Sequence, residues 1–138
     1  MRAITLHEPW ASAVAWGLKT WETRTWKIAP GLLAIHASAL RSNRDHRDFY
    51  YEQVCALARG RRITPPIWAS LPFGAVVATC RVARCLPAEE ARYLVDRAAP
   101  SAVLGDFSAG RWAWELVDLV RLARPSLARG HQGLWDWR

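Results

Sequence analysis

The apolar and polar residues at the start of the chain predict a strand, a short helix and a second strand. Residues 3–7 predict a short strand, and Pro9 suits the first turn of a helix over 9–16. Gly17 is a typical residue after a helix end, so the helix is expected to stop there. Residues 20–26 alternate and are rich in threonine and tryptophan, which predicts a strand.

The middle of the chain predicts one buried strand and one longer helix. Residues 32–37 are almost all apolar, which indicates a strand buried on both faces. A helix is predicted over 44–60, where apolar residues recur at helical spacing. The side chains expected on its buried face are Phe49, Tyr50, Val54 and Leu57.

Several short strands separated by turn-rich segments complete the pattern. The remaining elements are a loop over 61–72, a strand within 73–86, a short helix within 88–97, a loop over 100–110, a strand over 111–117 that residues 120–123 extend past a bulge, and a closing strand over 133–137. Five or six strands with an early helix and no regular βαβ alternation favour an α+β fold built around a small β-barrel.

The length and composition are typical of one globular domain over residues 1–138. Hydrophobic residues make up 51% of the chain and charged residues 22%, which excludes a wholly disordered protein. No apolar run approaches the roughly 20 residues of a membrane span, and the first ten residues lack the apolar core of a secretory signal. We expect no membrane association.

The cysteines and histidines indicate neither disulfides nor a metal site. Cys55, Cys80 and Cys85 are odd in number and include no pair at C-x-x-C spacing, so we expect reduced thiols and a cytoplasmic protein. The four histidines are scattered, and none lies at zinc-ligand spacing from a cysteine or from another histidine. The sequence predicts no cofactor and leaves the oligomeric state open.

The charge balance favours a polyanionic partner. Lysine and arginine number 19 against 12 for aspartate and glutamate, which gives a net charge of +7. All of these cations except Lys19 and Lys27 are arginines, whose planar donor fork matches phosphate and stacks on bases. The alternative is that the arginines reflect the base composition of the genome.

Lys19, Glu22 and Arg24 form the richest cluster of candidate chemistry. On a strand Glu22 and Arg24 share one face, and Lys19 joins them if it sits in the turn before that strand. The cluster then offers a carboxylate flanked by two cations. The alternative is an exposed ion-pair cluster that contributes well under about 1 kcal/mol.

The same stretch resembles the ASCH domain, a family of the PUA-like superfamily. The resemblance rests on Pro9-Trp10-Ala11-Ser12 after the lead His7-Glu8, followed by Gly17-x-Lys19-x-x-Glu22-x-Arg24. Three later blocks are similar to further strands and the closing motif of the family: Gly31–Ser38, Gly110–Leu116 and Arg129-Gly130-x-x-Gly133-Leu134-Trp135. Together they run from Leu6 to Trp135, with a weaker middle over 41–71.

The resemblance implies a PUA-like barrel of about five to seven mostly antiparallel strands, with flanking helices and a cleft beside the first helix. Related domains bind RNA or read modified bases in such clefts. We therefore expect RNA or another single-stranded nucleic acid, including one with a modified base, to bind there. The expected ligand-binding residues are His7, Trp10, Lys19, Glu22, Arg24, Trp26, His36 and Ser38. We expect the strand over 32–37 to pair with the strand over 20–26, because only a short Pro-Gly turn region separates them. If the register is right, this pairing brings His36 and Ser38 to the cleft.

Arginines that follow the helix over 44–60 are candidates for contacts with the nucleic-acid backbone. Arg59, Arg61 and Arg62 have no acidic neighbour in sequence, which favours phosphate contacts. The alternative is a solvated loop.

Whether the protein is an enzyme stays open at the level of sequence. Some small relatives hydrolyse N4-acetylcytidine, a nucleoside amide, with a threonine three residues after the motif lysine as nucleophile. Glu22 stands at that position here, which counts against the same chemistry. A ribonuclease that uses Lys19, Glu22 and Arg24 is a second enzymatic alternative, and a protein-interaction module that uses exposed tryptophans is a third function class.

Overall fold

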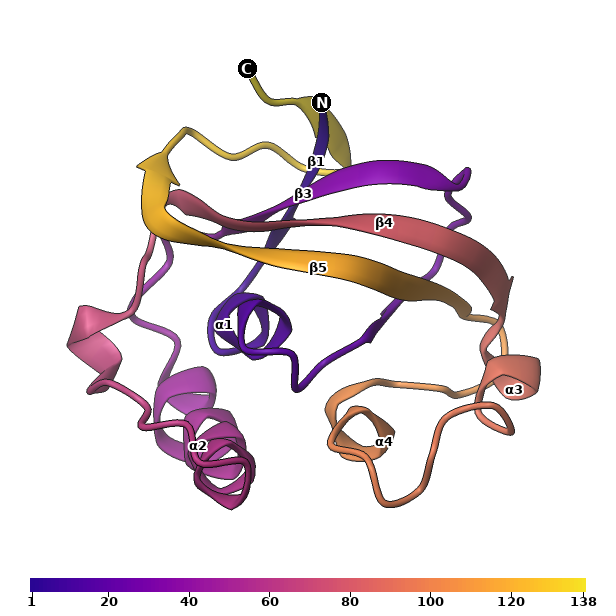
Figure 1. Cartoon of the computed structure of the whole chain (residues 1–138), viewed down its shortest axis with the longest axis horizontal. Helices are drawn as coiled ribbons and strands as arrows, with labels where there is room; N and C mark the ends of the chain where they lie inside the picture. The colour runs from indigo at the N-terminus through magenta and orange to yellow at the C-terminus, as the bar shows by residue number, and fades with distance from the viewer.

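The computed structural model describes residues 1–138, which form one six-stranded sheet curled into a half-barrel with helices beside it (Figure 1). The strands are β1 (Arg2–Leu6), β2 (Trp21–Arg24), β3 (Gly31–Ala37), β4 (Ala75–Pro87), β5 (Trp112–Leu127) and β6 (Leu134–Asp136). Their order in the sheet is β2-β5-β4-β3-β1-β6, and every neighbouring pair is antiparallel except β1 with β3. The predicted α+β barrel-like fold with mostly antiparallel strands is confirmed.

Six short helical segments connect and cover the strands. They are α1 (Trp10–Ala15), the π-helix η1 (His46–Tyr50), α2 (Tyr51–Gly60), the 3-10 helix η2 (Trp68–Ser70), α3 (Ala88–Ala91) and α4 (Ser101–Leu104). Figure 1 shows α1, α2 and α4 on one side of the sheet. The segment over 100–110 was predicted as a loop, but it contains the single turn of α4. None of the helices has the length and hydrophobicity that crossing a bilayer requires.

The predicted pairing between the strands over 20–26 and 32–37 is wrong. β2 pairs with β5, so that Glu22 lies opposite Trp114, whereas β3 lies between β1 and β4. The physical reason lies in the sequence of the two strands. β3 is nearly all apolar and is buried best in the interior of the sheet, whereas the polar alternation of β2 suits an edge.

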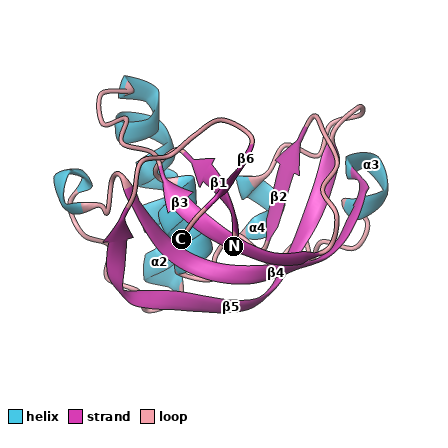
Figure 2. Cartoon of the chain, turned by 90° about the horizontal axis from the view of Figure 1, so that it is seen from above, coloured by secondary structure: helices cyan, strands magenta, loops and turns pink.

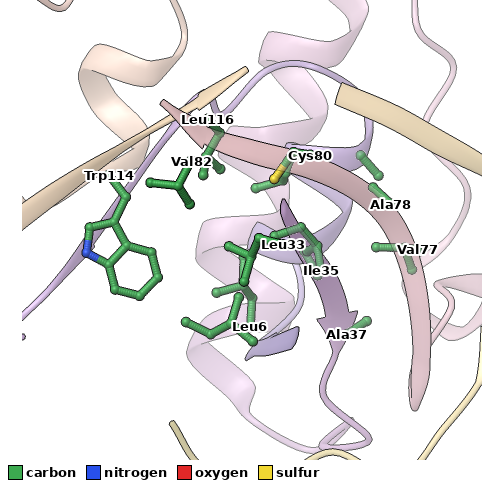
Figure 3. Packing of buried hydrophobic residues seen from close by; sticks show 14 of the residues in the cluster. Leu6, Leu33, Ile35, Ala37, Val77, Ala78, Cys80, Val82, Trp114 and Leu116 are labelled. Atoms are coloured by element: carbon green, nitrogen blue, oxygen red, sulfur yellow. The ribbon is translucent and has the colours of Figure 1, made fainter. Parts of the chain in front are cut away.

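The main core lies between the sheet and α1. Leu33 and Ile35 of β3 meet Val82 of β4 and Trp114 of β5 in a cluster of 15 buried residues, part of which Figure 3 shows. Figure 2 shows that β4 and β5 are long and strongly curved. Register shifts interrupt their pairing, and such bulges bend and twist strands. The bending wraps the sheet around the buried face of α1.

The predicted buried face of the second helix is partly wrong. Val54 is buried as expected, but Phe49 is 65% exposed, and Tyr51 and Cys55 are buried instead. The first turns of this helix form the π-helix η1, whose wider turn shifts the helical phase. Residues that a regular α-helix would turn inward therefore face outward before α2 begins.

Candidate functional site

Three adjoining cavities form one groove between β1, β2 and the segment that leads into β6. The loop lobe, of about 630 Å³, is bordered by residues 128–133. The helix lobe, of about 350 Å³, lies between Trp10 and Arg111. A passage of about 310 Å³ shares three residues with the loop lobe and four with the helix lobe. The shared residues are Thr5, His7 and Arg24 on the first side and Trp10, Glu22, Thr23 and Arg111 on the second.

The turn after α1 places Lys19 beneath β2. Gly17 has a φ of +74°, the left-handed conformation that commonly ends a helix. The backbone N–H groups of Leu18 and Lys19 both donate to the carbonyl oxygen of Ala13, at 2.9 and 3.1 Å. The chain therefore folds back tightly, and Lys19 lies in the turn just before the strand that carries Glu22.

Lys19 and Glu22 form a buried ion pair that lines the helix lobe. Lys19 Nζ donates to Glu22 Oε1 at 3.2 Å and to the Trp21 carbonyl oxygen at 2.5 Å. The backbone N–H of Thr23 donates to the same Oε1 at 2.9 Å. Lys19 is only 3% exposed, so this pair is not the exposed cluster of the alternative interpretation.

The second carboxylate oxygen of Glu22 remains free for a ligand. Oε2 accepts no hydrogen bond from the protein and is not among the fully buried polar atoms that lack a partner, so solvent reaches it. Nη2 of Arg24 lies 3.8 Å from it, beyond hydrogen-bond distance. Lys19 and Thr23 thus fix one oxygen and leave the other as an accessible acceptor.

Two arginines form the rims of the passage. Arg24 Nη2 donates to the backbone carbonyl oxygen of Thr5 at 3.1 Å, which links β2 to β1. Arg111 Nη2 donates to the carbonyl oxygen of Thr23 at 2.9 Å, and its Nε lies 3.5 Å from the Asp106 carboxylate. Both guanidinium groups donate to backbone carbonyl oxygens, and the two arginine side chains remain about one-quarter exposed.

His36 positions the wall of the loop lobe. Its Nε2 lies 2.7 Å from the Ala128 carbonyl oxygen, so this nitrogen carries the proton and donates. Nδ1 then accepts from the Thr5 hydroxyl at 3.2 Å, and that hydroxyl oxygen accepts from Trp135 Nε1 at 3.1 Å. Burial lowers the pKa of His36, which favours this neutral form. Although His36 lines the lobe, both ring nitrogens are occupied by the protein.

Aromatic rings gather where the helix lobe opens. Trp10 stands edge-on to His46, with ring centroids 4.7 Å apart, and contacts Tyr50 at 5.1 Å. His7 lies 5.4 Å from His46. Burial lowers the pKa of His46, and the neighbouring His7 lowers it further. Trp10 and Tyr50 both line the helix lobe, so aromatic side chains lie beside Glu22.

The two residues of the His7-Glu8 lead have different environments. His7 is exposed and borders both the loop lobe and the passage. Glu8 is buried, and its carboxylate accepts hydrogen bonds from the backbone N–H of Ser12 at 2.7 Å and from the Ser12 hydroxyl at 2.5 Å. Burial raises the pKa of Glu8, and the bonds from Ser12 oppose that change. Glu8 thus anchors α1, whereas His7 faces the groove.

The groove collects most of the residues that the sequence singles out. Those that line it are His7, Trp10, Lys19, Glu22, Arg24, His36 and Ser38. Trp26 lies elsewhere and packs edge-on against Trp114, with ring centroids 4.9 Å apart. The three arginines at the end of α2, Arg59, Arg61 and Arg62, are exposed and border none of the cavities. Their contact with phosphate stays a prediction.

Several groove residues were not expected from sequence. They are Thr5, Tyr50, Gln53, Arg111, Arg129, His131 and Gln132. Arg111 and Arg129 belong to the late blocks on which the family resemblance rests, so those blocks were the available indication. No three histidine, cysteine, aspartate or glutamate side chains come together in a group that could hold a metal ion.

Comparison with known proteins identifies the family. The model of the ASCH domain matches residues 4–126, which is most of the chain and includes the turn with Lys19 as well as β2 with Glu22 and Arg24. No curated protein matches the chain. The curled mixed sheet, the helix beside it and this match agree with the sequence blocks described above. The chain therefore belongs to the ASCH domain family, within the PUA-like superfamily.

Proposed function

We propose that this protein binds single-stranded RNA in the groove and that Glu22 recognises the edge of an unpaired base. The geometry at Glu22 carries the proposal. One carboxylate oxygen is fixed by Lys19 and Thr23, and the other is accessible without a donor from the protein. A carboxylate accepts hydrogen bonds only, so it favours a base edge that presents an amino or imino N–H group.

The aromatic groups beside Glu22 support an unpaired base rather than a duplex. Trp10 and Tyr50 line the same lobe and offer ring faces on which a base can stack. Stacking of this kind contributes about 1–3 kcal/mol per base. An A-form duplex keeps its bases stacked inside and its major groove too narrow for side chains to read, so single strands fit this lobe better.

The family and the charge support the same ligand class. The ASCH domain is a family suggested to bind RNA, and its model covers every residue that lines the helix lobe and the passage. The chain carries a net charge of +7, which favours association with a polyanion. Arg24, Arg111 and Arg129 supply cations along the groove itself.

The amidohydrolase alternative lacks a free hydroxyl at the required place. Glu22 occupies the position of the nucleophilic threonine, and the two neighbouring threonines have structural partners. The Thr20 hydroxyl pairs with the Ser101 hydroxyl at 3.0 Å, and the Thr23 hydroxyl oxygen accepts from the backbone N–H of Asp106 at 3.2 Å. No observation in the groove favours turnover over binding.

The test measures binding of one RNA sequence as a single strand and as a duplex, together with single-stranded DNA, over a range of salt concentrations. We expect the RNA single strand to bind most tightly, with log affinity falling linearly against log salt. Single-stranded RNA homopolymers are measured in the same way to find which base is preferred. Glu22→Gln should abolish this preference for one base while keeping most of the overall affinity. Glu52→Gln, a change to an exposed carboxylate outside the groove, is the matched control.

Equal behaviour of Glu22→Gln and Glu52→Gln would contradict the proposal, as would a preference for duplex. Release of acetate from N4-acetylcytidine, or cleavage of the RNA during the same incubations, would instead support one of the enzymatic alternatives.

A further inference from the structure

We infer that the loop lobe holds a phosphate group of the nucleotide whose base lies in the helix lobe. The inference deepens the proposed function and rests on it, because it assigns the two ends of one groove to two parts of one ligand. The shared chemistry is a phosphate oxyanion, supplied either by a terminal phosphomonoester or by the phosphodiester of a strand.

The two lobes differ in charge. The loop lobe is bordered by Arg24, Arg129, His7 and His131, and its lining contains no aspartate or glutamate. The helix lobe contains two carboxylates, from Glu22 and Asp106, which the cations of Lys19 and Arg111 balance. An oxyanion is therefore favoured at the loop lobe and disfavoured beside Glu22, whereas a base edge with N–H donors has the opposite preference.

Hydrogen bonds and close packing hold the wall of the loop lobe in place. His36 and Thr5 hold this wall through the Ala128 carbonyl oxygen and through Trp135. Gly130 packs so closely on them that a Cβ there would lie 2.6 Å from a His36 ring carbon and 2.7 Å from the Thr5 hydroxyl oxygen. The backbone beside Arg129 and His131 is thereby fixed. Binding an anion therefore does not incur the entropic cost of ordering this segment of the backbone.

The cavities have the size and continuity that one nucleotide requires. The loop lobe, of about 630 Å³, lies within the range of about 300–1,000 Å³ typical of small-molecule sites. Arg24 and His7 border both this lobe and the passage, and Glu22 borders both the passage and the helix lobe. A ribose in the passage would therefore connect a phosphate at Arg129 with a base at Glu22.

The test compares the four ribonucleosides with their 5′- and 3′-monophosphates and with dinucleotides that carry only an internal phosphodiester. Affinities are measured by calorimetry for the wild-type protein and for Arg129→Ala. The matched control is Arg124→Ala, which removes the same charge from an exposed position outside every cavity. Inorganic phosphate is added as a competitor in a second series.

We expect a phosphate to tighten binding at least tenfold over the nucleoside with the preferred base. Arg129→Ala should remove most of this gain and leave nucleoside affinity unchanged, whereas Arg124→Ala should keep it. Inorganic phosphate should compete with the monophosphate but not with the nucleoside. A gain confined to the monophosphates assigns the lobe to a terminal phosphate, and a gain shared by the dinucleotides assigns it to a strand.

Two results would overturn the inference, and they separate it from the proposed function. If nucleosides and RNA bind in a manner that depends on Glu22 but a phosphate adds nothing, only the loop-lobe assignment fails. If no nucleoside, nucleotide or RNA single strand binds, the proposed function and the inference fail together.

Discussion

The guanidinium group of Arg24 on β2 donates a hydrogen bond to the backbone carbonyl oxygen of Thr5 on β1, at 3.1 Å. β2 is the first strand in the sheet order and β1 is the fifth, so this bond joins two strands that do not pair with each other. The same guanidinium group lies 3.8 Å from Glu22 Oε2. One side chain thus sets the separation of β1 and β2 and borders the free acceptor of the site.

Arg24→Lys tests this double role, because lysine keeps the charge but loses the planar fork. A single ammonium group cannot span the Thr5 carbonyl and the Glu22 carboxylate in the same geometry. We expect RNA binding to weaken by about 1 kcal/mol, because the charge-assisted hydrogen bond to the Thr5 carbonyl oxygen, which orients the cation beside Glu22, is lost. Arg124→Lys, at an exposed position outside the groove, should leave the affinity unchanged. An unchanged affinity of Arg24→Lys would show that only the charge matters, and an equal loss in both variants would contradict a specific role of Arg24.

The buried pair of Lys19 and Glu22 predicts strong coupling between two substitutions. Lys19→Met leaves the Glu22 carboxylate without its main partner and should lower the free energy of unfolding by about 3 kcal/mol. Adding Glu22→Gln removes the unpaired charge, so the double variant should recover part of that loss. Urea unfolding of the two single variants and the double variant measures the coupling. Strictly additive losses would contradict a stabilising pair.

Gly130→Ala should disturb the wall of the loop lobe. The new Cβ would lie within 2.7 Å of both the His36 ring and the Thr5 hydroxyl oxygen, so either the backbone or these two hydrogen-bonded side chains must move. We expect the free energy of unfolding to fall by about 1–3 kcal/mol, which is typical of overpacking. Gly60→Ala is the control, because nothing lies within 4 Å of a Cβ at that helical position. The contrast is measured by urea unfolding, and equal effects would contradict it.

The buried His36 predicts a loss of stability in mild acid. Because burial lowers the pKa of His36, the unfolded chain takes up a proton at a higher pH than the folded protein does. The stabilisation is complete above the unfolded-state value of about 6.5 and is lost as the pH falls towards the folded-state value. His36→Gln, which can still bond to Thr5 and Ala128, should remove this pH dependence.

The measurement compares unfolding of the wild-type protein and His36→Gln at a series of pH values. Their difference cancels contributions that both share, including those of His46 and Glu8, whose pKa values are also shifted. A difference that stays constant across mild acid would show that His36 does not titrate with folding.

Much of the fold could be predicted because local patterns match local structure. Gly17 after the first helix and the alternation at Glu22 and Arg24 fixed the turn and the strand that build the helix lobe. The strands were located correctly because apolar periodicity depends on nearby residues. Strand partners depend on contacts far apart in sequence, so β2 was assigned to β3 although it pairs with β5.

The wall of the loop lobe over residues 128–133 could not be predicted, because it meets the rest of the groove only through tertiary packing. Residues 128–133 are far in sequence from the other groove residues, and the bond between His36 and Ala128 holds them at the groove. The exposure of Phe49 was missed for a related reason. A π-turn shifts the helical phase, and no residue type in 46–50 predicts such a turn.

The pairing of β1 with both β3 and β6 has a consequence for biosynthesis. β1 is made early, but the strand that covers its outer edge spans Leu134–Asp136. A nascent chain can begin to assemble β1 to β5 on the ribosome, yet one edge of β1 stays unpaired until those residues emerge. The wall formed by residues 128–133 is equally late. The groove is therefore complete only after residues 128–136 have been made, and chains interrupted before Ala128 lack this wall and the strand that covers β1.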